Sequence, residues 1–364
     1  MDFTSKKLVL FQNRYEILQL LRSSELSDTY LAFDRLSEKK VILKKIDSFK
    51  NDQSQNRSFC VERLIIESKI LSALNHPSVV RYVDSWGDKN DFCLVTQYVE
   101  SKSMKDEYRS ILPNREMIIE YMLELLESVQ YLHSKGVIHR DIKPSNILLG
   151  DTSILIDFNA SEARFIKFPH DPKIMGTAGY RCPESLRGDV STSCDIFAIG
   201  GTLLFLLTGK DPTGNLAAFR KLSPHHDLLN VAFKALDPYP SNRFSTASDM
   251  KRELLKLTKR QFYLICGTHM SSIEKNRFLI GRSDKADFKI EDSMKFVSPV
   301  HAEIQKVGSN FRILDKSLNG TFLYRNGVYT KITESNLLDG DFIVLCYKET
   351  KGPHRLIKFR NPLN

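Results

Sequence analysis

The segment that decides the fold is Val137-Ile-His139-Arg140-Asp141-Ile-Lys143-Pro-Ser-Asn146-Ile-Leu-Leu149. Apolar residues flank a polar loop in which the carboxylate of Asp141 precedes the amide of Asn146 by five positions. A short loop pinned on both sides by buried apolar residues holds these two side chains at a fixed separation. The carboxylate can then orient a hydroxyl and accept its proton, while the amide oxygen can reach a metal ion. We interpret the segment as a catalytic loop; the alternative is a polar loop between two strands.

Length and composition describe an ordinary globular protein. The length of 364 residues is enough for two domains with a core in each. The composition, 41% apolar and 27% charged, is that of a globular protein. The first residues lack the apolar run of a signal peptide, and the most apolar stretch, Phe197 to Leu207, suits a buried helix because it is too short to span a bilayer. We therefore expect a cytoplasmic protein without membrane attachment.

Cysteine usage points the same way. Six cysteines are scattered without a C-x-x-C spacing, at positions 60, 93, 182, 194, 266 and 346. This pattern predicts buried thiols in a reduced, intracellular protein, and neither a disulfide framework nor a zinc site.

The net charge of +9 is concentrated near the C-terminus. Residues 259–364 hold 18 Lys and Arg against 11 Asp and Glu, whereas residues 1–258 hold 35 against 33. This excess suits a phosphate-bearing or acidic ligand, although a solvated surface would explain it equally well. Nucleic-acid binding, which would be steeply salt-dependent, is not favoured because no basic motif interleaved with aromatic residues is present.

The loop with His-Arg-Asp and, five residues later, Asn resembles the catalytic loop of the Ser/Thr protein kinase family, and Lys143 is the residue type of its Ser/Thr branch. The resemblance implies transfer of the ATP γ-phosphoryl group to protein hydroxyls. Asp141 would orient the nucleophile and Lys143 would steady the transferred phosphate. The implied nucleotide and metal residues are Lys44 with Glu67 (Glu62 as the fallback), and Asn146 with Asp157 for Mg²⁺, with Mn²⁺ as an alternative.

The nucleotide pocket departs from the family at the glycine-rich turn. The family pattern G-x-G-x-x-G is replaced at its three glycines by Arg22, Ser24 and Ser27, so side chains should hold the loop further from the phosphates. By resemblance, Thr96 is the gatekeeper beside the adenine pocket, and the segment from Gln97 to Val99 is the hinge that pairs with adenine.

The segment after Asp157 departs twice more. Asn159 stands where the family has the Gly of Asp-Phe-Gly, a mild change because Asn tolerates positive φ. Residues 162–175 contain no Ser or Thr, so we expect no control by loop phosphorylation; Asp171 could supply the acidic partner of Arg140. Thr177 is expected to bond the catalytic loop.

Several matched residues imply structural roles in the helical part of the molecule. Asp195 matches the buried Asp that ties the catalytic loop to the core, Glu184 should pair with Arg243, and Cys182 replaces a small residue before Pro183. The compact length of this region suggests a bacterial-type kinase.

From Phe262 short alternating strands replace the helices, which predicts an all-β sandwich. Gly281-Arg282-Ser283, Ser298-Pro-Val-His301 and Asn319-Gly320-Thr321 together resemble the forkhead-associated (FHA) domain, a phosphothreonine-binding module. Arg282 and Ser298 would grip the phosphate, Asn319 would fix the ligand backbone, and His301 would support the loop. Leu318 stands where many members carry a hydroxyl, and Asn319-Gly320 could instead be a hairpin turn.

We therefore predict an α+β protein: a bilobal kinase fold followed by an all-β FHA sandwich. The expected boundaries are a tail at 1–13, a kinase domain at 14–258 with lobes at 14–100 and 101–258, and an FHA domain at 262–361. The expected partners are protein substrates and phosphothreonine proteins, or an autophosphorylated copy of the chain. The rival function is a pseudokinase scaffold that assembles phosphoproteins.

Overall fold

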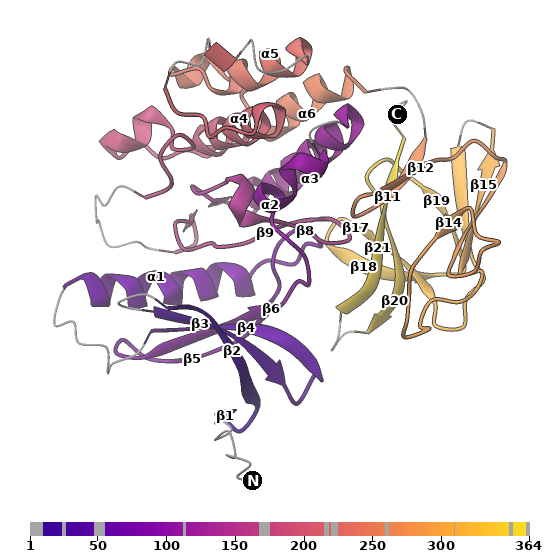
Figure 1. The fold of residues 1–364 in the computed structure, drawn as a ribbon, viewed down its shortest axis with the longest axis horizontal. Coiled ribbons are helices and arrows are strands. Elements are labelled where there is room, and N and C mark those ends of the chain that lie inside the picture. Colours follow the sequence, from indigo (N-terminus) through magenta and orange to yellow (C-terminus); the bar gives the residue numbers. More distant parts are fainter. Residues whose placement is uncertain are drawn as a thin grey trace, which may run out of the picture.

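A computed structural model describes residues 10–23, 27–46, 55–111, 114–166, 175–214, 218–219, 225–258, 262–308, 310–348 and 352–361. The chain forms two lobes, one built on a sheet and one helical, with a β-sandwich beside them (Figure 1). The predicted fold class is confirmed. Two predicted residues, Ser24 and Asp171, lie outside the described residues.

The first lobe is an antiparallel sheet with strand order β1-β2-β3-β4-β6-β5, and the three strands predicted between Tyr15 and Ile46 belong to it. Helix α1 (Gln55–Ser72) packs on β5 and β6 through a buried apolar face. The strands are β1 (Leu10–Phe11), β2 (Tyr15–Ser23), β3 (Ser27–Asp34), β4 (Lys39–Ile46), β5 (Tyr82–Gly87) and β6 (Phe92–Gln97).

The second lobe surrounds one apolar helix. Every residue of α4 (Thr192–Thr208) from Cys194 to Leu207 is buried, as predicted for this stretch. Ser191 caps its N-terminus and Gly209, with φ of 70°, ends it in the left-handed conformation. No helix in the described part of the chain is both long enough and apolar enough to cross a membrane.

Helices α3 and α5 pack against α4, and α6 packs against α3. The side chains of Asn114 and Thr246 cap the N-termini of α3 and α6. The remaining elements are α2 (Met104–Ile111), α3 (Arg115–Ser134), α5 (His226–Ala235), α6 (Ala247–Leu255), β7 (Val137–Ile138), β8 (Ile147–Leu149), β9 (Ser153–Leu155) and β10 (Glu162–Ala163).

The sandwich consists of a sheet of order β12-β11-β21-β20-β17-β18 and a sheet of order β14-β13-β15-β16-β19. Apolar side chains such as Ile280, Phe288, Phe311 and Ile343 fill its core. The strands are β11 (Tyr263–Cys266), β12 (His269–Ser272), β13 (Arg277–Gly281), β14 (Phe288–Lys289), β15 (Ala302–Val307), β16 (Asn310–Asp315), β17 (Thr321–Arg325), β18 (Val328–Ile332), β19 (Glu334–Leu337), β20 (Phe342–Lys348) and β21 (Gly352–Arg360).

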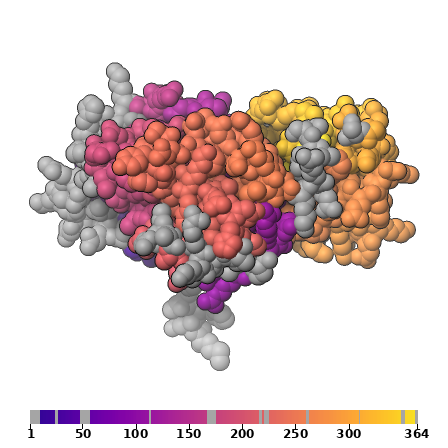
Figure 2. Space-filling model, turned by 90° about the horizontal axis from the view of Figure 1, so that it is seen from above, coloured from indigo at the N-terminus to yellow at the C-terminus, as the bar shows by residue number. Residues whose placement is uncertain are grey.

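A buried ionic contact joins the sandwich to helix α3, and the sandwich lies directly beside the helical lobe (Figure 2). Arg360 of β21, fully buried, donates to Glu120 at 3.0 Å and to Glu127 at 2.5 Å. Lys358 of β21 also binds Glu127. Burial alone would raise the pKa of the Glu127 carboxyl, but the cations around it hold that pKa well below its usual value. The sequence pattern contained no signal for this contact.

Candidate functional site

A lysine–glutamate pair lies where the sheet lobe meets the helical lobe. Lys44 of β4 donates to Glu67 of α1 at 2.9 Å, so the partner is Glu67 and not the fallback Glu62. Glu67 also accepts a bond from the backbone N–H of Phe158 at 3.1 Å. Since Phe158 follows Asp157, this one carboxylate fixes both the lysine and the start of the segment after β9.

The catalytic loop brings three polar side chains onto Asp141. Asn146 donates to Asp141 Oδ2 at 2.9 Å, Lys143 donates to the same oxygen at 2.7 Å, and Thr177 donates to Oδ1 at 2.7 Å. Lys143 also binds Thr177 Oγ1 at 2.6 Å. The expected bond from Thr177 to the catalytic loop is therefore present, and it links this loop to the segment that follows residue 175.

A buried carboxylate at the start of α4, that of Asp195, fixes the backbone of the catalytic loop. Asp195 accepts backbone N–H groups of His139 and Arg140 at 3.0 and 2.9 Å. His133 also lies 2.8 Å from the same carboxylate. Since Asp195 has no exposed surface, these bonds are shielded from water.

The residues present fit a divalent cation at Asp157. Its Oδ1 atom is buried, accepts no hydrogen bond from the described residues, and lies 3.8 Å from Lys44 Nζ. Burial would raise the pKa of Asp157, but Lys44, His139 and Lys143 outweigh it, so the pKa is lowered and the group is anionic. Carboxylate and amide oxygens are the ligands that Mg²⁺ prefers, and Asp157 and Asn146 supply one of each.

Arg22 and Ser27 lie at the facing ends of β2 and β3, in the same sheet as Lys44. Burial and the charge of Arg22 both act to lower the pKa of Lys44, but Glu67 and Asp157 outweigh them and the pKa is raised. Arg22 therefore adds positive charge where the family carries a glycine.

The predicted adenine-pocket residues lie at the end of β6. Thr96 pairs with Ile42 of β4 in the sheet register, and Gln97 donates from its backbone to Arg81 O at 2.9 Å. Val99 lies two residues beyond the end of β6, in the connection to the helical lobe. Thr96 and Gln97 thus lie on the strand adjacent to the one that carries Lys44.

The sequence analysis considered a positive φ at Asn159, but the structure has positive φ at other residues of this region. Arg140 and Asp157 have φ of 70° and 63°, whereas Asn159 is not among the described non-glycine residues with positive φ. The substitution of Asn for Gly is therefore tolerated because the position does not need the left-handed conformation. Positive φ at non-glycine residues is costly and is found where surrounding bonds enforce it, as Asp195 does at Arg140.

Two residues that the sequence analysis missed hold the segment after Asp157. Glu162 of β10 pairs with Arg140, the position for which Asp171 had been considered. Arg63 of α1 donates to Asn159 O and Ser161 O, each at 2.7 Å. Arg63 precedes Glu67 by four residues, which places both on one helix face, and this spacing could have indicated it.

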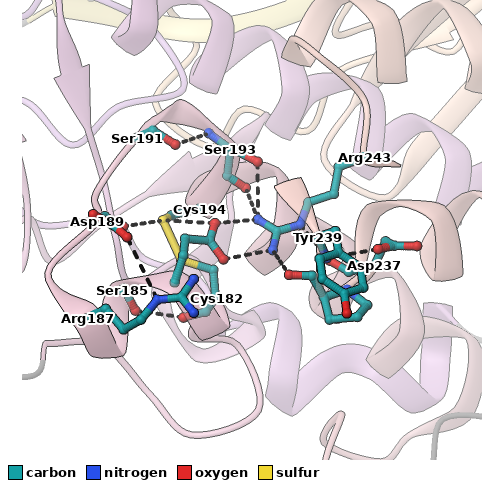
Figure 3. Close-up of polar contacts among 12 residues, drawn as sticks. Cys182, Ser185, Arg187, Asp189, Ser191, Ser193, Cys194, Asp237, Tyr239 and Arg243 are labelled. Atoms are coloured by element: carbon teal, nitrogen blue, oxygen red, sulfur yellow. Dashed lines mark hydrogen bonds and ion pairs between the residues drawn. A yellow bond between two sulfur atoms is a disulfide. The ribbon is translucent and has the colours of Figure 1, made fainter. Parts of the chain in front are cut away.

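Residues 175–190, here called the platform, contain Cys182, which forms a disulfide with Cys194 (Figure 3), so the prediction of reduced thiols is wrong for these two of the six cysteines. The two cysteines are 12 residues apart, but Cys194 lies at the start of α4, whose packing brings it beneath the platform. The expected pair is present beside it, with Arg243 donating to Glu184 at 2.6 and 2.8 Å. Because Arg243 holds the carboxylate and the sulfurs are bonded together, these residues offer no open metal site.

A second polar site lies at the end of the sandwich. Arg282 follows β13, and its backbone N–H donates to Ser298 O at 3.2 Å. Gly281 permits this approach, since a Cβ there would lie 2.2 Å from Pro299 O. Arg282 Nε and Ser283 Oγ are buried, and neither has a hydrogen-bond partner among the described residues. Buried donors in this state fit an anion.

The loops around Arg282 hold each other in place. His301 accepts from Ser298 N at 3.1 Å and also lies 3.3 Å from Gly320 O, so it is a fully buried support between loops. Asn319 donates its side-chain amide to Phe296 O at 2.8 Å. The Leu318 side chain is 94% exposed, while its N–H donates to Ser298 Oγ at 3.2 Å. Because β16 and β17 lie in different sheets, Asn319-Gly320 is not a hairpin turn.

Comparison with known proteins agrees with this geometry. Residues 15–263 match the protein kinase domain family, and the chain belongs to that family. Residues 278–346 match the FHA domain family.

The relatives are bacterial Ser/Thr kinases. The chain is 29% identical over 289 residues to serine/threonine-protein kinase PknD of Chlamydia felis (strain Fe/C-56), covering 66% of this chain and 30% of that protein. It is 31% identical over 269 residues to serine/threonine-protein kinase D of Synechocystis sp. (strain ATCC 27184 / PCC 6803 / Kazusa), covering 67% of this chain and 52% of that protein. The chain thus matches between about a third and a half of the length of these relatives.

Cys182→Ala should lower the free energy of unfolding of the oxidised full-length chain by about 2–4 kcal/mol, because it opens a short covalent loop. Urea unfolding with and without reductant measures the difference. In reductant, wild type and variant should agree to within about 1 kcal/mol. Cys346→Ala, which removes a cysteine outside the disulfide, is the control. Persistence of the full difference in reductant would show that packing, and not the disulfide, is responsible.

Proposed function

We propose that this chain transfers the γ-phosphoryl group of ATP to Ser and Thr hydroxyls of proteins, and that its FHA domain binds phosphothreonine partners. The observation that carries the proposal is a chain of contacts: Lys44 Nζ lies 3.8 Å from Asp157 Oδ1, the N–H of the preceding Ile156 donates to Asn146 O at 3.0 Å, and the Asn146 amide donates to Asp141 at 2.9 Å. Phosphoryl transfer depends chiefly on positioning and on stabilising charge, and these groups supply both.

Each group has a role that follows from its position. Asp141 orients the attacking hydroxyl and accepts its proton, while Lys143 stabilises charge on the transferred group. Lys44, kept protonated by its carboxylate partners, binds the phosphates. Asn146 and Asp157 would hold Mg²⁺, with Mn²⁺ as an alternative; a bound cation neutralises charge on the phosphates. We place the activity in the cytoplasm, where ATP is available.

A pseudokinase scaffold is the less favoured function. Loss of the three glycines of the family's turn would hold that turn further from the phosphates, but it removes no charged group from the cleft. Arg22, close enough to influence Lys44, adds a cation beside the phosphate position. An inactive lobe has no need to retain the arrangement of Asp141, Lys143 and Asn146.

We propose that Glu162 supplies permanently the negative charge that loop phosphorylation supplies elsewhere. Kinases controlled by loop phosphorylation pair the new phosphate with the Arg of His-Arg-Asp. Here the guanidinium of Arg140 is already paired with Glu162. Ser161 is fully buried and donates to His139 O at 3.1 Å, so a kinase cannot reach it without unfolding the segment.

We propose that Arg282, Ser298 and Asn319 bind the phosphothreonine. The buried, unsatisfied Nε of Arg282 supports this role, as does its position beside Ser298. Charge-assisted hydrogen bonds of this kind contribute about 1.5–3 kcal/mol each. The partner would be a phosphorylated protein or an autophosphorylated copy of the chain.

Asp141→Asn should lower kcat by about 10²–10⁴-fold, because the amide cannot accept the hydroxyl proton. Initial rates of radiolabel transfer to generic protein substrates, with Mg²⁺ and with Mn²⁺, measure the loss. Glu253→Gln, at a partly exposed carboxylate on α6, is the control and should retain the wild-type rate. Wild-type protein with no signal above the Asp141→Asn variant would exclude the kinase activity.

Glu162→Ala should lower kcat/KM by about 10–100-fold, corresponding to the loss of one charge-assisted bond to Arg140. Glu162→Asp should restore part of the rate. Phosphatase treatment of the wild-type chain should leave the rate unchanged. Mass spectrometry that finds stoichiometric phosphate at Ser161, together with loss of activity after phosphatase, would contradict the proposed role of Glu162.

Arg282→Ala should abolish binding of phosphothreonine peptides, because it removes the cation nearest to the proposed phosphate position, and should leave phosphorylation of generic substrates intact. Calorimetry with matched phosphorylated and unphosphorylated peptides measures both variants. Arg312→Ala, which removes a partly exposed arginine of β16, is the control. Equal peptide affinity in Arg282→Ala and wild type would refute the assigned pocket.

A further inference from the structure

The two proposed metal-binding residues stand at the base of one small hairpin. Asn146 precedes β8 and Asp157 follows β9, and Ile156 N donates to Asn146 O at 3.0 Å. Gly150, Asp151 and Thr152 form the turn at the other end of the hairpin. Because the two strands are only three residues long, the turn lies close to both residues at the base.

The turn of this hairpin is bound by the FHA domain. Asp151 O accepts from Gly267 N at 2.7 Å, and Asp151 Oδ2 accepts from Leu356 N at 3.1 Å. Arg355 Nη1 lies 3.7 Å from Asp151 Oδ1. The approach is close enough to need glycine: Gly267 has φ of 59°, and a Cβ there would lie 2.8 Å from Gly150 O.

The same stretch of β21 touches the loop that leads to Ser298. Arg355 Nη2 donates to Glu291 O at 3.1 Å, and His354 Nε2 lies 3.2 Å from Asp292 Oδ1. The ring of His354 packs on Phe296 with 5.0 Å between centroids. Phe296 O is the atom that accepts the side-chain amide of Asn319. The guanidinium of Arg355 therefore contacts the loop of the proposed phosphothreonine site on one side and the hairpin turn on the other.

The sandwich and the β8–β9 hairpin are both attached to helix α3. Arg360 and Lys358 bind Glu120 and Glu127 of α3 in a buried contact. On the hairpin side, Glu124 of α3 accepts from Ser153 N and Oγ at 2.8 and 2.6 Å. With both attached to the same helix, a shift in residues 291–298 is passed to Arg355 and Asp151.

We infer that phosphothreonine binding in the FHA domain and metal–nucleotide binding in the kinase cleft are energetically coupled through Arg355 and Asp151. This inference rests on the two binding functions proposed above. The side-chain amide of Asn319 already donates to Phe296 O and has a second N–H and an acceptor oxygen for a ligand backbone, so it links a bound ligand to the loop that Arg355 contacts. A phosphate held by Arg282 and Ser298 orders this loop, so the hairpin is already fixed when the nucleotide binds. The coupling is positive, and it is reciprocal.

Calorimetry on the full-length chain tests the coupling. The probes are Mg²⁺ with a non-hydrolysable ATP analogue, and a synthetic phosphothreonine peptide selected from a degenerate library on the same chain. In wild type, saturating peptide should lower the nucleotide Kd at least fivefold, and saturating nucleotide should lower the peptide Kd by the same factor. The unphosphorylated peptide should have no effect.

Arg355→Ala should reduce the coupling factor to below twofold while each ligand still binds alone. Asp151→Asn keeps an acceptor for Leu356 N but removes the charge that faces Arg355, and should weaken the coupling in the same way. Arg312→Ala should keep the wild-type factor. Because the Arg355 side chain is 35% exposed and Asp151→Asn is nearly isosteric, two independent variants guard against a folding defect.

Two results would overturn the coupling while leaving the proposed function standing. One is a wild-type chain that binds both ligands with Kd values independent of each other to within twofold. The other is an Arg355→Ala chain whose coupling equals that of wild type. A wild-type chain that binds nucleotide but no phosphothreonine peptide would instead refute the proposed function of the FHA domain, and the coupling with it.

Discussion

The buried carboxylate of Asp195 is the contact on which the geometry of the cleft depends. It accepts two consecutive backbone N–H groups, at His139 and Arg140, and so determines how the chain enters the catalytic loop. The positive φ of Arg140 is maintained by these bonds. Asp141 follows immediately, and its two oxygens are then shared among Lys143, Asn146 and Thr177. Helix α4, at the centre of the helical lobe, thereby fixes the position of Asp141 through Asp195.

A second set of contacts makes helix α3 the common support of the molecule. One of its faces packs in the core of the helical lobe, and its glutamates bind β21 of the sandwich and Ser153 of the β8–β9 hairpin. Burying several charges is favourable only when each finds partners of opposite sign, and Glu127 has three in Arg360, Lys358 and Lys251. The β8–β9 hairpin and the sandwich are therefore both attached to one element, helix α3.

Local pattern was sufficient to predict the fold class and the contact between Lys44 and Glu67. The spacing of Asp141 and Asn146 and the alternating strands after Phe262 are properties of short segments, and the structure has the corresponding elements. Contacts between segments that are distant in the sequence could not be predicted from such short patterns. Cys182 and Cys194 meet only because α4 passes under the platform, and Glu162 reaches Arg140 only because β10 pairs with β7. The same is true of Arg360 and Glu120, which are 240 positions apart.

The attachment of the sandwich to α3 also bears on which partners could be used. A module on a flexible tether would raise the local concentration of any bound protein over a broad range of geometries. A module fixed by buried charges would instead keep its binding site at a constant distance from the catalytic loop. A bound partner would then need enough extended chain between its phosphothreonine and its acceptor hydroxyl to bridge that separation, so the length of this stretch would contribute to selectivity independently of the residues beside either site.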